Sequence, residues 1–136
     1  MPVAANSPFQ YAVLRVVPDL ERGEFLNAGV VVFARTLGFL SARVALDRDR
    51  LNALFPGVEA EPVAGRLEAL ARIAAGDPQA GPIARLEPSE RFNWLVAPAS
   101  TVVQPSPVHT GLCEDPEQML EHLFGRLVSN TPSSSR

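Results

Sequence analysis

Residues 29–46, GVVVFARTLGFLSARVAL, decide the fold that the sequence predicts. Two runs rich in β-branched and aromatic residues, 29–35 and 39–46, lie on either side of the connection TLG (36–38). A three-residue connection that ends in glycine is typical of a β-hairpin. The stretch therefore predicts two antiparallel strands joined by a tight turn.

The side chains of this hairpin can be assigned to two faces, because they alternate along each strand. If residue 35 pairs with residue 39, residue 33 lies opposite 41 and residue 31 lies opposite 43. One face is then uniformly apolar and is expected to pack against helices; it carries Val30, Val32, Ala34, Leu40, Ala42, Val44 and Leu46. The opposite face is mixed and carries Val31, Phe33, Arg35, Phe39, Ser41 and Arg43.

The mixed face is the first candidate binding surface, and we call it the arginine–phenylalanine face. Its members are Phe33, Arg35, Phe39, Arg43 and, from a preceding strand, Arg15. Arginine binds planar anions and stacks on aromatic rings, so this surface fits an acidic protein partner, a nucleotide or single-stranded RNA. The alternative is a half-exposed sheet whose arginines cover the phenylalanines and keep them soluble. No broad basic patch supports nucleic acid, so a protein partner is favoured.

The rest of the chain predicts an α+β domain. Further strands are expected over 9–17 and 100–104, and helices over 48–55, 62–75, 89–98 and 116–129. In the third helix, where a strand is the alternative, Phe92 and Trp94 are expected to be core anchors. The predicted fold is a small, mostly antiparallel sheet of three N-terminal strands plus one short later strand, covered on one face by helices. We expect a flexible N-terminus over 1–8, a single domain over 9–129 and a disordered tail over 130–136.

Composition and charge exclude several classes of function. The 136 residues carry a net charge of −3 with a pI near 5.3, so no general attraction to nucleic acid or to an anionic membrane is expected. All 12 basic residues are arginine, which excludes lysine Schiff-base chemistry and a lysine phosphate clamp. The single cysteine cannot form an internal disulfide, and no signal peptide or membrane-spanning run is visible. A cytoplasmic protein is therefore expected.

The segment QPSPVHTGLCEDP (104–116) holds most of the reactive side chains of the chain. Its last residues have a structural explanation, because Asp115 can cap the final helix. Two histidines and one cysteine are too few for an ordinary zinc site, so no metal or other cofactor is expected. His109 is a candidate general acid/base, with Ser106 and Thr110 beside it. The alternative is a histidine that fixes the loop through hydrogen bonds.

Four stretches of the chain resemble a known family: EFLNAGV (24–30), GPI (81–83), ERFNWL (90–95) and SPVHTG (106–111). Together they are similar to the bacterial domain-of-unknown-function family 3037, and the resemblance runs from about Phe9 to Val128. It implies a bacterial, single-domain protein without an established activity. It also implies a gene near a HipA-type kinase, and hence a role as partner or regulator. The polar positions that match the family's motifs are Glu24, Asn27, Arg91, Ser106, His109 and Thr110.

Two functions remain open on the sequence. The favoured one is an interaction or regulatory domain that binds a protein partner, kinase-like or a second copy of the chain, through the arginine–phenylalanine face. The other is a small enzyme or ligand-binding domain acting on an anionic substrate, a nucleotide or a nucleic acid. In that case His109 would be the general acid/base, Arg91 would contact the anion, and Glu24 and Asn27 would orient it.

Overall fold

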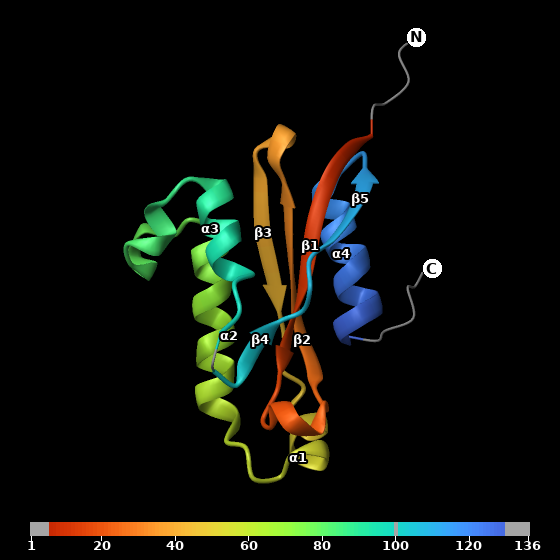
Figure 1. The fold of residues 1–136 in the computed structure, drawn as a ribbon, viewed down its shortest axis with the longest axis vertical. Helices are drawn as coiled ribbons and strands as arrows, with labels where there is room; N and C mark the ends of the chain where they lie inside the picture. Colours follow the sequence, from red (N-terminus) through yellow and green to blue (C-terminus); the bar gives the residue numbers. More distant parts are fainter. Residues whose placement is uncertain (1–5, 100, 130–136) are drawn as a thin grey trace.

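An antiparallel sheet of five strands runs through the middle of the domain (Figure 1). The computed structural model describes residues 6–99 and 101–129. The strands are β1 (Ser7–Val16), β2 (Leu26–Ala34), β3 (Phe39–Val44), β4 (Val103–Pro105) and β5 (His109–Cys113). Their order is β3-β2-β1, and the far edge of β1 carries two short strands in succession: β5 along its first half and β4 along its second.

Helices cover both faces of this sheet (Figure 1). They are α1 (Arg48–Leu54), α2 (Ala60–Ala74), α3 (Pro88–Leu95) and α4 (Pro116–Phe124), the last continued by a π-helical turn over Gly125–Ser129. α2 and α3 lie together over one apolar cluster on one side of the sheet. α4 lies over a second apolar cluster on the other side. The predicted α+β fold with an antiparallel sheet is confirmed, but the sheet has a fifth strand and is covered on two faces instead of one.

The β2–β3 hairpin forms where the sequence predicts it, but its register differs by one residue. Phe33 pairs with Leu40, whereas the predicted register placed it opposite Ser41. The cause is the connection, because Arg35 leaves the strand and begins a 3-10 turn that closes at Gly38 with φ 62°. A slip of one residue moves every β3 side chain to the opposite face.

The two faces of the sheet are therefore built differently from the prediction. The α2–α3 side carries Val31, Phe33, Leu40, Ala42 and Val44 from the hairpin. The α4 side carries Val30, Val32, Ala34, Phe39, Ser41 and Arg43. Because both faces of β2 are covered, this strand is apolar at successive positions, as buried strands are.

α1 and α4 each begin at an aspartate whose carboxylate caps the helix, and the sequence predicts the cap at Asp115. The Asp47 carboxylate accepts a hydrogen bond from the Arg50 amide at 3.1 Å, and the Asp115 carboxylate accepts one from the Glu117 amide at 3.0 Å. β1 begins at Ser7, two residues before the predicted start of the domain. Residues 1–5 of the predicted flexible N-terminus and the predicted tail over 130–136 lie outside the described residues.

Candidate functional site

The arginine–phenylalanine face does not exist as one surface. Phe33 is only 3% exposed and stacks on Phe92 beneath α2 and α3, with ring centroids 5.0 Å apart. Phe39 lies on the opposite face, partly buried against the cluster under α4. Arg35 is exposed in the hairpin turn.

The two other arginines of this predicted surface are held by separate neighbours. Arg43 forms an ion pair with Glu121 of α4 and lies 5.0 Å from the ring centroid of Phe124. Arg15 lies over the ring of Phe25, 4.0 Å from its centroid. Aromatic faces attract such cations. The prediction that the five side chains share one surface is wrong. The register of β3 puts Phe39 and Arg43 on the face opposite to Phe33, and Arg35 lies in the turn.

Ser106 joins β4 to β5 at the edge of the sheet. It is 3% exposed, and its hydroxyl oxygen accepts a hydrogen bond from the Val13 amide at 2.8 Å. Its own amide donates to the Val13 carbonyl at 2.8 Å, and its hydroxyl donates to the Pro107 carbonyl at 2.8 Å. Ser106 thus completes the hydrogen bonding of β1 where the pairing changes from one short strand to the other. This is a structural role that the sequence analysis did not foresee.

His109 begins β5 and is exposed. It pairs with Tyr11, and the two rings stack with centroids 5.1 Å apart. Thr110, the next residue, is exposed and pairs with Gln10. Gly111 pairs with Phe9, whose ring lies where a glycine Cβ would be: Phe9 Cε1 is 2.8 Å from that position. The segment predicted as a functional loop is therefore an edge strand.

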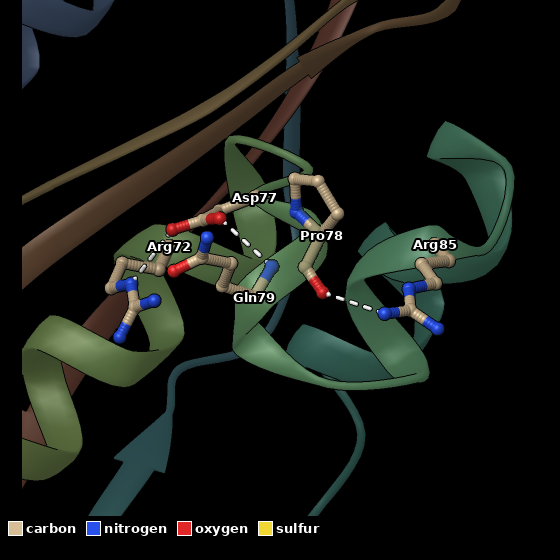
Figure 2. Close-up of polar contacts among 5 residues, drawn as sticks. All are labelled: Arg72, Asp77, Pro78, Gln79 and Arg85. Carbon is tan, nitrogen blue, oxygen red and sulfur yellow. Dashed lines mark hydrogen bonds and ion pairs between the residues drawn. The ribbon is translucent and has the colours of Figure 1, made fainter.

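The connection between α2 and α3 is tied together by its own polar contacts (Figure 2). Arg72 Nε donates to Asp77 Oδ2 at 2.9 Å, and Asp77 Oδ1 accepts a hydrogen bond from the Gln79 amide at 2.9 Å. Arg85 Nη2 donates to the Pro78 carbonyl at 3.2 Å. The hydrogen bond from the Gln79 amide, followed by that from Arg72, lowers the pKa of Asp77.

Arg91 donates to backbone carbonyls at both ends of the connection between α2 and α3. Its Nη1 donates to the Leu86 carbonyl at 2.7 Å and its Nη2 to the Ala74 carbonyl at 3.4 Å. The guanidinium also lies 3.4 Å from the position that a Cβ would take at Gly76, which has φ 73°. A cation that binds the last carbonyls of a helix stabilises its C-terminus. These contacts are structural and leave the predicted anion contact without support.

Glu24 forms an ion pair with its neighbour Arg22, whose Nε donates to Glu24 Oε1 at 2.8 Å. This hydrogen bond, with the charge of Arg22, lowers the pKa of Glu24. The carboxylate expected to orient a substrate is thus paired with a neighbouring arginine at the surface. His109, Arg91 and Glu24 come from different elements, and none of them lines the cavities described below.

Arg15 and Asn27 are two predicted site residues that the structure brings together, as it does Phe39 and Arg43. They pair across β1 and β2, next to a β-bulge. Asn27 Nδ2 donates to the Leu127 carbonyl at 3.0 Å and so fastens the end of the α4 segment to the sheet. Arg15 Nε and Asn27 Oδ1 are buried and bond to no residue of the described chain. Neither residue lines any of the cavities described below, which favours a structural junction over a ligand site.

The open edge of the sheet is β3, which pairs with β2 alone within the described part of the chain. A groove of about 250 Å³ lies between this strand and α4; its lining residues are Phe39, Ser41, Ala42, Arg43, Glu117, Leu120 and Glu121. A second groove, of about 230 Å³, lies between the end of β3 and α2; its lining residues are Val44, Ala45, Leu46, Arg48, Ala64, Leu67 and Glu68. The sequence analysis missed both grooves, because they depend on the register of β3 and on helices on both faces.

Two further predictions concern single side chains. Phe92 is buried, at 2% exposure, and its role in the core is confirmed. Trp94 is 37% exposed and lines a cavity with Arg66, so the core role predicted for it is wrong. Phe92 and Trp94 are two residues apart on a short helix, and residues two apart do not share a helix face. This spacing could have predicted that only one of the two is buried.

Cys113 is buried at the end of β5. Burial, and to a lesser degree the charge of Asp115, raises the pKa of its thiol. Nowhere in residues 6–99 and 101–129 do three His, Cys, Asp or Glu side chains gather closely enough to hold a metal ion. In the same residues no helix is long and apolar enough to cross a membrane.

The fold and its sites define an α+β protein with helices on both faces of an antiparallel sheet and two grooves along one sheet edge. The chain belongs to the family described as Protein of unknown function (DUF3037), whose model matches residues 11–128. The resemblance noted in the sequence is thereby confirmed. No curated protein and no solved structure matches the chain.

Proposed function

We propose that this protein is an interaction domain that binds an extended segment of a partner protein along the open edge of β3. The observation that carries the proposal is a groove on each side of that edge. We call the groove between β3 and α4 the α4-side groove, and the groove between the end of β3 and α2 the α2-side groove. Side chains of an added strand alternate between the two faces of the sheet, so successive residues of the partner would enter the α4-side groove and the α2-side groove in turn.

The backbone of β3 supports the same proposal. The Ala45 amide donates to the Ala28 carbonyl of β2 at 2.9 Å. Inward and outward donors alternate along an antiparallel strand, so the amides of Leu40, Ala42 and Val44 point away from β2. These donors can form the ladder with a partner strand.

The lining of the grooves suggests the chemistry of the partner segment. The α4-side groove contains Glu117 and Glu121 against the single cation Arg43, so it favours a basic side chain. The α2-side groove is lined mainly by Val44, Leu46, Ala64 and Leu67 and favours an apolar one. A segment that alternates basic and apolar residues fits both. A kinase-like partner is the expectation from the family, and the proposal requires such a segment on it.

Site-specific photocrosslinking in cells that produce the protein tests the proposal. A photoreactive p-benzoylphenylalanine at Ser41, inside the α4-side groove, should form a discrete adduct, whereas the same group at the exposed Arg50 of α1 should not. Ala42→Pro, which removes an outward donor, should abolish the adduct, and Ala42→Val should retain it. Mass spectrometry of the adduct identifies the partner segment. Adducts that are identical at both positions, or that persist in a folded Ala42→Pro variant, contradict the proposal.

A further inference from the structure

A third cavity lies between α2, α3 and β4, at the sheet edge opposite to β3. Its volume is about 160 Å³, and much of its wall is apolar, from Leu14, Leu70, Leu95, Val103 and Pro105. Arg66 of α2 and Trp94 of α3 also line it. A hollow of about 230 Å³ adjoins the cavity and shares two lining residues with it, Arg66 and Val103.

Arg66 lines this cavity without a carboxylate partner among the described residues. Arg22, Arg43, Arg48 and Arg72 each pair with a carboxylate, whereas no carboxylate of the described chain pairs with Arg66. Its guanidinium carbon lies 5.8 Å from the ring centroid of Trp94, and its Nε is buried and makes no hydrogen bond to a described residue. Arg15 and Arg91 also have a buried Nε without a hydrogen bond to a described residue, but neither of them lines a cavity described above. A cation that is partly removed from water without an anion is costly, so this site is poised to gain from a bound negative charge.

The surroundings of Arg66 restrict the kind of anion. The lining of the cavity and of the adjoining hollow includes no acidic residue and no second arginine among the described ones. A single planar guanidinium pairs with a carboxylate or with a phosphate, but it neutralises only one charge. The second charge of a phosphate dianion would stay unpaired beside apolar walls, so a carboxylate is favoured. The apolar walls accommodate a hydrocarbon body, and an apolar protein cavity of ~150 Å³ is known to hold a benzene-sized ligand.

We propose that this cavity is a binding site for a small monocarboxylate with an apolar body. The carboxylate binds Arg66 beside the Trp94 ring, and the hydrocarbon chain occupies the space between Leu70, Leu95 and Val103. The site is independent of the β3 edge, because it shares no lining residue with either groove.

Titration with hexanoate tests this proposal directly. Trp94 is the single tryptophan of the chain, so its fluorescence reports on this cavity alone. Hexanoate should give a saturable change at concentrations below about 10 mM, in keeping with a ligand of few atoms. Hexan-1-ol, which has the apolar chain without the charge, and inorganic phosphate, which has the charge without the chain, should give none at the same ionic strength.

Two variants and one spectrum complete the test. Arg66→Gln should weaken hexanoate binding about tenfold or more, because a charge-assisted pair is lost. Arg50→Gln, which changes an exposed arginine on α1, should bind as the wild type does. In the wild type, hexanoate should shift the amide signals of residues 66, 70, 94, 95 and 103 in the NMR spectrum. This measurement requires no variant. An equal affinity in Arg66→Gln, no saturable change in the wild type, or shifts elsewhere in the chain would overturn the proposal.

Discussion

The two edges of this sheet are built on opposite plans. The β3 edge is an unbroken strand, FLSARV (39–44), with outward amides and a groove on each side. The other edge consists of the short strands β4 and β5, and Pro105 and Pro107 flank Ser106 at their junction. Proline lacks the amide donor that an added strand would need, and a broken edge resists pairing. One edge of the sheet is thus protected against strand addition, whereas the other is left available.

Proline substitutions on β3 should have the largest effect on the free energy of unfolding, and they test whether this edge of the sheet is open. The Ser41 amide faces β2 by the alternation of donors, so Ser41→Pro removes a ladder hydrogen bond and should cost about 3 kcal/mol or more of unfolding free energy. The Ala42 amide faces outward, so Ala42→Pro should cost much less. Urea denaturation followed by circular dichroism measures both. Equal losses in the two variants would show that the β3 edge is not open as described.

The closed edge depends on one hydroxyl. Ser106→Ala removes the acceptor of the Val13 amide, which stays buried, so the unfolding free energy should fall by about 1–3 kcal/mol. Thr110→Ala, at an exposed position of β5, should change it by less than about 0.5 kcal/mol. Hydrogen exchange of the Val13 amide should accelerate in the first variant only. A stable Ser106→Ala protein with an unchanged Val13 amide would contradict the assigned role.

All elements of the sheet and its helical layers except β5 could be predicted, but the register of the hairpin and the arrangement of the layers could not. The hairpin and the four helices follow from local patterns around residues 29–46 and from caps such as Asp47 and Asp115. The register failed because Arg35 adopts a turn conformation, which adds one residue to the loop. The apolar run of β2 indicated that both faces of the strand are buried. The same residues also fit an alternating pattern in which one face is exposed.

The candidate site was harder to predict, for a related reason. Arg91, Ser106 and Asn27 stand out in the sequence as polar residues without a local task, but each bonds to backbone groups far along the chain. Sequence separations of 17 to 100 residues hide such partners from local reasoning. Conversely, Arg66 looks like an ordinary helix arginine, and only the packing of α3 and β4 shows that it lines a cavity.

A smaller effect is expected at Gly111, where Phe9 folds its ring across β5. A Cβ at this position would lie 2.8 Å from Phe9 Cε1, so Gly111→Ala must displace a buried ring and should cost about 1–2 kcal/mol. Gly65→Ala, in the middle of α2 with open space around its Cβ, should instead stabilise the protein by up to about 1 kcal/mol. Thermal melting of both variants gives the comparison. Stabilisation by Gly111→Ala would show that the ring does not pack on β5.

The smallest effect is expected for the thiol of Cys113, which lies at the end of β5 and so reports on the sheet edge opposite to β3. Burial first, and then the charge of Asp115, raises the pKa of this thiol above its ordinary value of 9.0. Because the folded-state pKa is the higher one, the stabilising contribution is complete below pH 9.0 and is lost as the pH rises through the folded-state pKa. The unfolding free energy should therefore decrease slightly in this alkaline range.

The rate at which iodoacetamide alkylates Cys113 at pH 8 measures how readily this edge opens. Cys113 should react far more slowly in the folded protein than in urea, since only an opening of β5 beneath α4 exposes the thiolate. A cysteine introduced by Ser41→Cys on β3 lines an open groove and should react at a rate close to that of the unfolded chain. If both thiols reacted equally fast, the β5 edge would open as readily as β3 is exposed. The prolines around Ser106 would then block strand addition without making that edge more stable.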